Sequence, residues 1–453
     1  MSSLNKSLSA ALQAREKRLI RRRLPEVSSS QILDFTSNDY LSLSTSPVLR
    51  NAVLAALNSA PQILGSGGSR LLVPVPAHLA LEASLCRFLD AESALLFNSG
   101  FDANVGFFSA VPQPGDAVLY DAHIHASVHD GMRMSRLIRD SLIPFAHNAV
   151  SDLRRALARL IRDREGLKAG KTSVFVAVES LYSMDGTFAP LAEIVGCLEE
   201  MLPLGNGYLV VDEAHATGIY GPKGRGLVAA LGLEKRVLAR LHTFGKALAA
   251  SGAVILTTEL VRDYLLNYAR SLIYTTTLTF ANVIAVGCSF DLLEDGTTEV
   301  LSAHLLDLCT YFLELLRPEL KKYPSTLLCL PDHLAEDADV KPSPSSPRSF
   351  TFPPPTPIIP ILTPEPPPCP LPSPIPNRIS IHTKPIFPPT VPPGTSRVRI
   401  CLHAGHARAD VEALVGGIIA WAEKRVREGA REREGWERGV GEVGVGVWME
   451  ARL

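Results

Sequence analysis

Hydrophobic residues along the chain form short unbroken runs that alternate with longer amphipathic stretches, most clearly between residues 46 and 295. The short runs have the length and aliphatic content of buried strands: 94–97, 117–120, 174–178, 208–211 and 253–256. Stretches such as 153–161 and 191–201 repeat their hydrophobic residues at helical spacing. This alternation predicts an α/β domain in which helices cover both faces of a mostly parallel sheet.

Polar residues lie at or just beyond the ends of several of these strands. Asn98, Glu179 and Asp212 end or follow an aliphatic run, with His215 close behind, and Lys246 comes after a further strand-like run. Parallel α/β sheets bind their ligands at the carboxyl ends of the strands. The pattern therefore predicts a single site built from these positions.

An amphipathic helix is predicted at the start of the chain. Three leucines recur there at helical spacing: Leu4, Leu8 and Leu12. Ser2 or Ser3 is a candidate cap, and the pattern leads into the basic stretch 15–23. A start rich in Arg and Ser is also typical of a transit peptide, which stays an alternative.

The C-terminal third has a different pattern. Residues 296–331 and 410–428 have helical periodicity, and 397–402 resembles a strand. Of the 35 prolines, 22 lie in 331–393, which we interpret as a linker rather than a ligand for an SH3 or WW domain. The tail 429–453 is charged, then rich in Gly and Val, and is expected to be poorly ordered.

Composition excludes several classes of protein. The 453 residues carry 45 Lys and Arg against 46 Asp and Glu, a balance too even for a polybasic nucleic-acid binder. No apolar run reaches the roughly 18–20 residues of a membrane span, so we expect a soluble globular protein without nucleic-acid or membrane partners. Its seven scattered cysteines lack CxxC spacing, which argues against a zinc site and for a reducing compartment.

Two segments carry the candidate chemistry. LVVDEAHATG (209–218) contains Asp212 and His215, and HTFGKAL (242–248) contains Lys246. Earlier lie a glycine-containing turn, NSGFDAN (98–104), and a histidine in HIHAS (123–127). Taken singly, such residues are more often a cap, a surface charge, a turn or a hydrogen-bonded loop histidine.

Together these residues meet the requirements of pyridoxal 5′-phosphate. This cofactor needs a Lys for a Schiff base, an Asp to keep its pyridine nitrogen protonated and a flat group over its ring. It also needs N–H and hydroxyl donors for its phosphate at a helix N-terminus. A dinucleotide-binding interpretation of GSGGS (65–69) is disfavoured, because that stretch lacks the G-x-G-x-x-G register and follows no strand-like run.

The chain resembles the α-oxoamine synthases, fold-type I pyridoxal-phosphate enzymes that condense an amino acid with an acyl-CoA and release CO2. The motifs that carry the resemblance are SNDYL (37–41), GSGGSRL (65–71), NSGFDAN (98–104), HAS (125–127), ESLYSMDG (179–186), VDEAHATG (211–218), GPKGRG (221–226), TFGKAL (243–248) and IYTTTL (273–278). The match covers roughly residues 10–330 and resumes at about Pro388.

This resemblance implies a fold and a domain division. It implies a large pyridoxal-phosphate-binding domain, 46–295, with a mostly parallel seven-stranded sheet. A helix and arm, 1–45, would precede it. A smaller α+β domain, 296–428, interrupted by the proline-rich segment 331–393, would follow.

The resemblance also implies the roles of the site residues. As catalytic residues, Lys246 would form the Schiff base, Asp212 would pair with the pyridine nitrogen, His215 would hydrogen-bond the phenolic oxygen and His125 would stack on the ring. Around the cofactor, Ser99, Gly100 and Phe101 would form the turn that meets it, Glu179 and Ser183 would lie near its ring, and Thr243 would bind its phosphate with Thr276 from the other subunit of a homodimer. Asn38 and Arg399 would orient the substrate carboxylate, and Arg21 would lie on the acyl-CoA side. Capping roles for Glu179 and Ser183, and a surface role for Arg399, are the structural alternatives.

The expected reaction joins L-alanine to pimeloyl-CoA and gives 8-amino-7-oxononanoate, CoA and CO2, a step of biotin biosynthesis. Within the family, a glycine C-acetyltransferase, a 5-aminolevulinate synthase, a serine palmitoyltransferase subunit or a secondary-metabolite enzyme are alternatives. A non-catalytic homologue is an alternative of another class.

Three departures from the family pattern bear on this expectation. VPVPAH (73–78) replaces a Gly-containing turn near the acyl pocket, and Ala249 stands where Gly is frequent. The third departure is PEPPPCPLPSPIP (364–376), which replaces an amphipathic helix and cannot form one. This last departure predicts lower stability than that of relatives.

The C-terminal residues Ala451, Arg452 and Leu453 resemble the tripeptide read by the peroxisomal import receptor. Peroxisomal import is therefore the expected localisation, with the cytoplasm or mitochondrion as alternatives.

Overall fold

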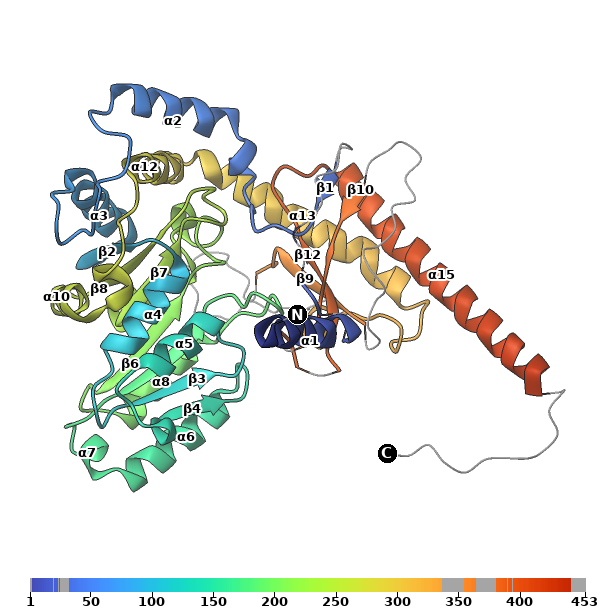
Figure 1. The fold of residues 1–453 in the computed structure, drawn as a ribbon, viewed down its shortest axis with the longest axis horizontal. Coiled ribbons are helices and arrows are strands. Elements are labelled where there is room, and N and C mark those ends of the chain that lie inside the picture. Colours follow the sequence, from blue (N-terminus) through green and yellow to red (C-terminus); the bar gives the residue numbers. More distant parts are fainter. Residues whose placement is uncertain are drawn as a thin grey trace, which may run out of the picture.

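A seven-stranded sheet forms the larger part of the computed structural model, which describes residues 2–18, 20–22, 24, 32–335, 354–363, 380–388, 390–392 and 394–440 (Figure 1). Its strands are β2 (Ser93–Phe97), β3 (Ala117–Asp121), β4 (Leu142–Phe145), β5 (Val174–Glu179), β6 (Gly207–Asp212), β7 (Ala239–Thr243) and β8 (Ala253–Thr257). They lie in the order β2-β8-β7-β6-β5-β3-β4, and only β8 runs antiparallel to its neighbours. The predicted mostly parallel sheet of seven strands is confirmed.

Both faces of this sheet are buried, which explains why its strands read as unbroken aliphatic runs. On one face Phe175 and Ala177 of β5 pack with α4 (Gly100–Ala110) and α5 (Ala126–Met134). On the other face Val176 and Val178 pack with α6 (Val150–Asp163) and α8 (Leu191–Met201). The alternation follows from the two-residue period of a strand.

The remaining helices complete this layer arrangement and the connections to the second half of the chain. They are α1 (Ser3–Lys17), α2 (Pro47–Ser59), α3 (Pro76–Leu89), α7 (Glu165–Lys168), α9 (Leu227–Ala230), α10 (Glu259–Tyr268), α11 (Arg270–Ile273), α12 (Phe280–Glu294), α13 (Thr297–Leu320), α14 (Asp332–Ala335) and α15 (Arg408–Val440). Helix α13 crosses from the large-sheet half to the small-sheet half (Figure 1).

A small antiparallel sheet forms the core of the second half. Its order is β11 (Lys384–Ile386), β12 (Arg397–Cys401) and β9 (Ile358–Leu362), and α13 and α15 pack together beside it. The N-terminal arm also joins this half, because β1 (Ile32–Asp34) pairs in parallel with β10 (Ser380–His382). The predicted smaller α+β unit is confirmed.

The two ends of the chain add detail to the predicted pattern. Ser2 is the cap of α1, since its Oγ accepts a hydrogen bond from the Asn5 N–H at 3.3 Å, and the leucine stripe of this helix is exposed. Helix α15 continues to Val440, beyond the expected end at Glu428. Among the described residues, no helix is both long and apolar enough to cross a membrane.

Parts of the proline-rich segment are ordered, since it contributes α14, β9, β10 and β11. Prolines are compatible with strands at sheet edges and bulges, where fewer backbone N–H donors are required. The stretch 364–376, expected to replace a helix, and the C-terminal tripeptide 451–453 both lie outside the described residues.

Candidate active site

A cavity of about 330 Å³ opens at the carboxyl ends of β5, β6 and β7. Its lining residues are Asn38, Ser99, Gly100, Phe101, Asn104, His125, Glu179, Asp212, Ala214, His215, Thr243, Gly245, Lys246, Ser251 and Gly252. The cavity thus brings together the four predicted catalytic residues and most of the predicted binding residues. Asp212 and Lys246, which the prediction required to face one cofactor, line the same space.

Strand ends account for this convergence. Glu179 and Asp212 are the last residues of β5 and β6 and are paired in register, so both carboxyl groups lie on the same face of the sheet. Thr243 ends β7, and Lys246 lies in the turn that follows it. His125 is the N-cap of α5, just beyond β3.

Asp212 is held by donors on both of its oxygens. Its Oδ1 accepts from the Ala214 N–H at 2.9 Å, and its Oδ2 accepts from Nδ2 of Asn104 at 2.9 Å. The same Asn104 nitrogen lies 3.0 Å from Oγ of Ser127, which is 2.7 Å from Nδ1 of His125. One network therefore orients the carboxylate and the imidazole that flank the cavity.

A second network holds His215. The hydroxyl of Tyr40 lies 2.7 Å from Nδ1 of His215 and donates to Oδ1 of Asn38 at 3.1 Å. The Nη2 of Arg399 donates to the same Asn38 oxygen at 2.9 Å and to the Tyr40 hydroxyl at 3.3 Å. Arg399 therefore lies directly behind Asn38 at the cavity wall, on strand β12 of the small sheet.

Burial and charge set the protonation of Lys246 and the imidazoles. Burial lowers the pKa of Lys246, although the charge of Asp212 acts in the opposite direction. Burial also lowers the pKa of His125, and that of His215 well below its usual value, with the charge of Lys246 adding to the effect. Both imidazoles are therefore neutral at pH 7, which leaves each with one donor and one acceptor nitrogen.

Glu179 is a second carboxyl group beside Asp212. Burial, and then the charge of Asp212, raises the pKa of Glu179 well above its usual range, which favours the protonated, neutral form of this group. Its Oε2 accepts only a 3.3 Å hydrogen bond from the Ser183 N–H. Its buried Oε1 has no hydrogen-bond partner among the described residues, which leaves a polar atom free to contact a bound group.

The N-terminus of α4 forms the floor of the cavity on its other side. Ser99 caps this helix through its Oγ, which accepts from the Asp102 N–H at 3.0 Å. The N–H groups of the first turn have no partner within the helix and favour an anion. A Cβ on Gly100 would collide with Cγ2 of Thr243, so the close approach of this turn to Thr243 requires glycine.

Four predicted residues lie outside the cavity lining. Arg399 and Ser183 lie just behind it, with Nε of Arg399 donating to the Ser183 carbonyl at 2.5 Å. Thr276 is exposed, and its carbonyl accepts from Nδ2 of Asn98 at 2.7 Å. Arg21 is also exposed and pairs with Glu16 at 3.3 Å, away from the cavity.

Sequence reasoning assigned no role to Asn104, Tyr40 or Ser127. All three lie inside quoted motifs, NSGFDAN, SNDYL and HAS, so a signal was present. Their functions became visible only from contacts with Asp212, His215 and His125, which are remote in sequence except for the Ser127–His125 pair.

The donor set of this cavity fits pyridoxal phosphate. An amine, a carboxylate with both oxygens fixed, and neutral imidazoles surround a space whose floor is a helix N-terminus beside a threonine hydroxyl. The partnerless Oε1 of Glu179 and the crowded Gly100 indicate a site shaped around a bound group rather than a packing defect. Lys246, Asp212 and Thr243 would hold the aldehyde, the ring nitrogen and the phosphate of that cofactor.

Comparisons with known proteins agree with this chemistry. The family model for class I and II aminotransferases matches residues 30–418. The 8-amino-7-oxononanoate synthase of Emericella nidulans is 43% identical over 94% of this chain and 98% of its own length. The aminoacyl transferase sphA of Aspergillus fumigatus is 38% identical over 87% of this chain and 82% of its own length.

Solved structures share the fold at lower identity. Serine palmitoyltransferase of Sphingomonas wittichii matches with a TM-score of 0.73 and 23% identity, over 93% of this chain and 99% of its own. The 8-amino-7-oxononanoate synthase of Francisella tularensis matches with a TM-score of 0.61 and 24% identity, over 88% and 98%. A further serine palmitoyltransferase match, also with a TM-score of 0.73, was solved with pyridoxal phosphate. The chain therefore belongs to the class I and II aminotransferase family and, within it, to the pyridoxal-phosphate-dependent α-oxoamine synthases.

Proposed function

We propose that this α-oxoamine synthase condenses L-alanine with pimeloyl-CoA, releasing CoA and CO2 and forming 8-amino-7-oxononanoate for biotin biosynthesis. The observation that carries the proposal is the 43% identity to an 8-amino-7-oxononanoate synthase along nearly the whole of both chains. Relatives of the same description from bacteria, such as Trichlorobacter lovleyi at 34% identity over 89% of this chain, add support.

The residues of the cavity supply the proton transfers that the reaction needs. Bound pyridoxal phosphate supplies an electron sink that makes a carbanion at the amino-acid Cα accessible. Because burial lowers the pKa of Lys246, its Nζ is more readily neutral and able to take the Cα proton and return it later. Asp212, with both oxygens fixed, holds a negative charge where the ring nitrogen must stay protonated.

Asn38 and Arg399 are suited to hold the amino-acid carboxylate. Arg399 is buried, lies next to the cavity and presents a guanidinium, which binds carboxylates in a bidentate manner. Asn38 lines the cavity and shares its Oδ1 with this arginine. A substrate carboxylate placed here would lie beside the neutral His215 and would gain a charge-assisted interaction.

A second candidate differs only in its substrates. Fungal sphA aminoacyl transferases are 37% and 38% identical to this chain over most of its length. These identities are close to that of the Emericella nidulans synthase. Segment 61–74, which includes Val73 and Pro74 at the start of the unusual VPVP turn (73–76), borders a separate cavity of about 530 Å³. A different acyl chain or amino acid is therefore the alternative substrate within the same reaction class. A non-catalytic homologue is disfavoured by the complete site.

The protein is also proposed to act as a homodimer. Several large apolar side chains near the cavity are exposed in the single chain: Leu64 (76%), Leu72 (79%), Tyr274 (72%) and Phe101 (46%). Backbone hydrogen bonds from Phe280 N–H to Leu64 and from Thr277 N–H to Gly68 join the segments that carry them. Exposed apolar side chains of this size are typical of a subunit interface, and Thr276, between Tyr274 and Thr277, is exposed as well.

The test is product formation by purified protein loaded with pyridoxal phosphate. L-alanine, glycine and L-serine would each be combined with pimeloyl-CoA, palmitoyl-CoA and acetyl-CoA, with products identified by mass spectrometry. The proposal predicts 8-amino-7-oxononanoate as the main product, absent from the Lys246→Ala variant. A preferred product from any other pair would replace the proposed substrates, and no product from any pair would favour the non-catalytic homologue.

A further inference from the structure

Asp185 lies between two cations at the junction of the two halves of the molecule. It follows β5, two residues beyond Ser183, and its Oδ1 pairs with Nη1 of Arg397 on β12. Its Oδ2 lies 2.7 Å from Nδ1 of His123, just beyond β3. This second contact is an ion pair when the imidazole is protonated.

Arg397 and Arg399 lie two residues apart on β12, and their side chains reach the same loop. Arg399 donates from Nε to the Ser183 carbonyl at 2.5 Å, and Arg397 donates from Nη1 to the Met184 carbonyl at 3.3 Å. Both side chains are buried, with 7% and 5% of their surfaces exposed. The loop 183–186 is therefore the surface on which the small sheet rests beside the cavity.

Loop 183–186 packs tightly against the small sheet. Gly186 adopts a φ of +67°, and a Cβ there would collide with the Ile358 carbonyl on β9. The backbone of the loop thus presses directly against the small sheet. His333 of α14 adds a contact from Nε2 to the Asp185 carbonyl at 3.1 Å.

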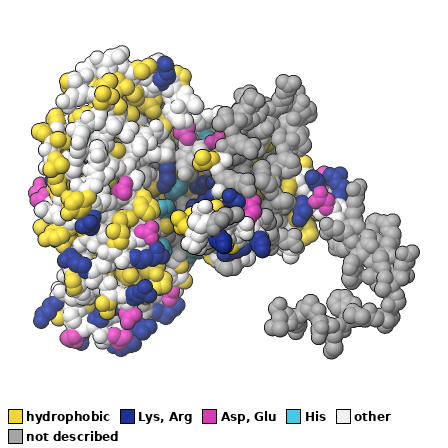
Figure 2. Space-filling model, in the orientation of Figure 1, with side chains coloured by type: hydrophobic (Ala, Val, Ile, Leu, Met, Phe, Trp, Pro, Cys, Tyr) yellow, Lys and Arg dark blue, Asp and Glu magenta, His cyan; other side chains and the backbone are white. Residues whose placement is uncertain are grey.

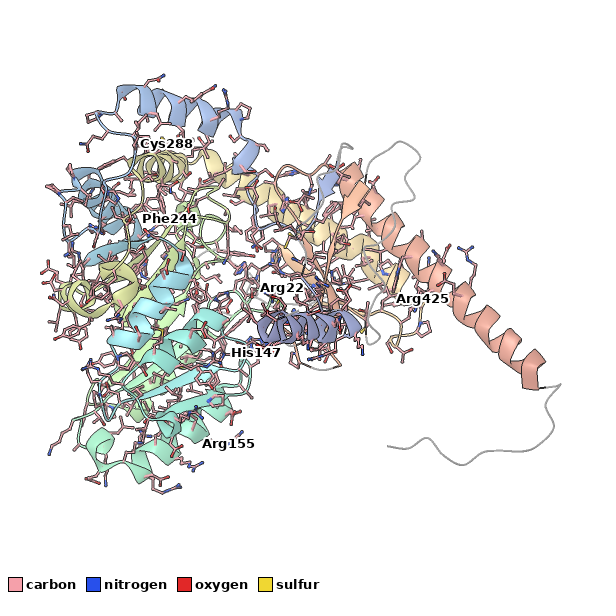
Figure 3. The ribbon with its side chains drawn as sticks, viewed as in Figure 1. Arg22, His147, Arg155, Phe244, Cys288 and Arg425 are labelled. Carbon is pink, nitrogen blue, oxygen red and sulfur yellow. The ribbon has the colours of Figure 1, made fainter. Side chains whose placement is uncertain are left out.

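A metal ion does not account for this cluster. His123 and His147 stack with ring centroids 4.1 Å apart and planes 18° apart, and one possible ligand atom from each, with one from Asp185, lie within 4.8 Å of one another, but both nitrogens of His147 already have partners. Nδ1 of His147 pairs with Asp121 at 2.8 Å, and its Nε2 lies 2.8 Å from Oγ1 of Thr187. Figure 3 shows His147 on the side of the large sheet that faces α1, and Figure 2 shows histidines at the same junction.

We propose that Asp185 is a positioning residue whose carboxylate, shared by Arg397 and His123, holds β12 against loop 183–186 and thereby fixes Arg399 for the substrate carboxylate. This inference rests on the proposed role of Arg399 in binding an amino acid. The ion pair between Arg397 and Asp185 fixes β12 relative to loop 183–186. Arg399, two residues further along the same strand, is thereby held in one position at the cavity wall.

Protonation of His123 strengthens the contact that Asp185 makes between loop 183–186 and β12. The contact with Asp185 raises the pKa of His123, whereas the charge of Arg397 acts in the opposite direction. The charged and titratable groups that face His123 are Asp185, Asp121, His147 and Arg397. The ion pair is present when His123 is protonated and is lost as pH rises through its raised pKa.

The experiment compares Asp185→Asn with a matched surface variant, Asp163→Asn, which removes the exposed ion pairs with Arg159 and Arg162 on α6. Both are loaded with pyridoxal phosphate, and the dissociation constant for L-alanine is measured from the change in cofactor absorbance. We expect Asp185→Asn to bind L-alanine about tenfold more weakly, the equivalent of about 1.4 kcal/mol. Its kcat at saturating L-alanine and its cofactor affinity should stay within about threefold of wild type, and Asp185→Glu should recover part of the loss.

A second variant keeps the test decisive if Asp185→Asn does not fold. His123→Gln should weaken alanine binding about threefold below the His123 pKa and converge on wild type as pH rises above it. Hydrogen exchange should be faster in the peptides covering 183–186 and 397–401 of both variants. Wild-type alanine affinity at every pH, or equal losses in alanine binding, kcat and cofactor binding, would overturn the positioning role.

The outcome is separable from the proposed substrates. Any α-amino acid carries the carboxylate that Arg399 would hold, so the titration uses whichever amino acid perturbs the wild-type cofactor spectrum. If the wild-type spectrum responds only to glycine or serine, the L-alanine assignment is wrong. The effect of Asp185→Asn on amino-acid affinity can then still be measured with that amino acid. A wild-type protein that responds to no amino acid would contradict both.

Discussion

Glu179 and Asp212 are paired in register on β5 and β6, and their carboxyl groups share one wall of the cavity. Two carboxylates so close in a buried site cannot both ionise easily. The donors are distributed unequally: Asp212 has hydrogen bonds on both oxygens, whereas Glu179 has one 3.3 Å hydrogen bond and an Oε1 without a partner in the described part of the chain. The structure therefore assigns the negative charge to Asp212 and the proton to Glu179.

This assignment predicts opposite outcomes for two isosteric substitutions. Glu179→Gln replaces one neutral group by another and should keep kcat/KM within about fivefold of wild type. Asp212→Asn removes the charge and should lower kcat on the order of a hundredfold or more. Steady-state kinetics of the two variants measures the contrast, and a larger loss in Glu179→Gln would reverse the assignment.

The hydrogen bonds of Asn104 should contribute to cofactor binding. Asn104→Ala removes the 2.9 Å donor to Asp212 and the link through Ser127 to His125. A hydrogen bond to a charged group contributes about 1.5–3 kcal/mol, so cofactor affinity should fall about tenfold to a hundredfold. Equilibrium titration with pyridoxal phosphate measures the loss. Ser109→Ala, at a position on the same helix that bonds only the Gly106 carbonyl, is the control and should bind as wild type.

Ala249 occupies a position that favours glycine. Its φ is +51°, in the left-handed region, directly after the turn that carries Lys246. That conformation costs a non-glycine residue roughly 1–2 kcal/mol, while glycine costs about 0.4–1 kcal/mol in unfolded-state entropy. Ala249→Gly should therefore raise the free energy of unfolding by about 0.5–1 kcal/mol, measured by denaturant titration.

The neighbouring Ala250 provides a control for that substitution. It is not among the residues with positive φ, and its side chain packs against a buried hydrophobic cluster that includes Phe244. Ala250→Gly should therefore lower the stability through lost burial and added chain entropy. Equal effects of the two substitutions would contradict the account of Ala249.

Asp185 predicts a pH dependence of stability with a defined sign. Burial opposes its ionisation, but the hydrogen bond from His123 and the charge of Arg397 lower the pKa of Asp185 to about 2, from 3.8. A lowered folded-state pKa stabilises the fold above the unfolded value, by about 2 kcal/mol, and this contribution is lost as pH falls from about 4 toward 2. Wild type should therefore exceed Asp185→Asn in unfolding free energy at pH 6, with the gap narrowing below about pH 4 and closing only as pH approaches about 2. A gap that is constant with pH would remove the electrostatic explanation.

Much of the large domain could be predicted because its strands are buried on both faces. Aliphatic runs such as that of β5 mark such strands without knowledge of their neighbours. Strand β7 (Ala239–Thr243) was expected only as a strand-like run before Lys246, without bounds, because buried Arg240 and His242 interrupt its pattern. Their partners, the Asp90 carbonyl and Thr217, are distant in sequence. Strand β4 is short and contains Pro144 at the sheet edge.

The candidate site also contains residues that could be placed from the sequence and residues that could not. Residues at strand ends, such as Asp212 and Glu179, could be placed from sequence because parallel strands end at one edge of a sheet. Partners that meet only in the folded chain, such as Tyr40 with His215 or Arg397 with Asp185, could not. Arg21 pairs with Glu16 and does not line this cavity, so its expected place on the acyl-CoA side stays a prediction.

The central claim is that the Lys246 amine binds pyridoxal phosphate above the Asp212 carboxylate. Its most direct test is the visible absorbance of purified protein after incubation with pyridoxal phosphate and removal of the excess. Wild type and the surface variant Lys171→Ala should retain the absorbance of lysine-bound cofactor, and Lys246→Ala should lose it. Retention of that absorbance in Lys246→Ala, with the protein folded, would contradict the account.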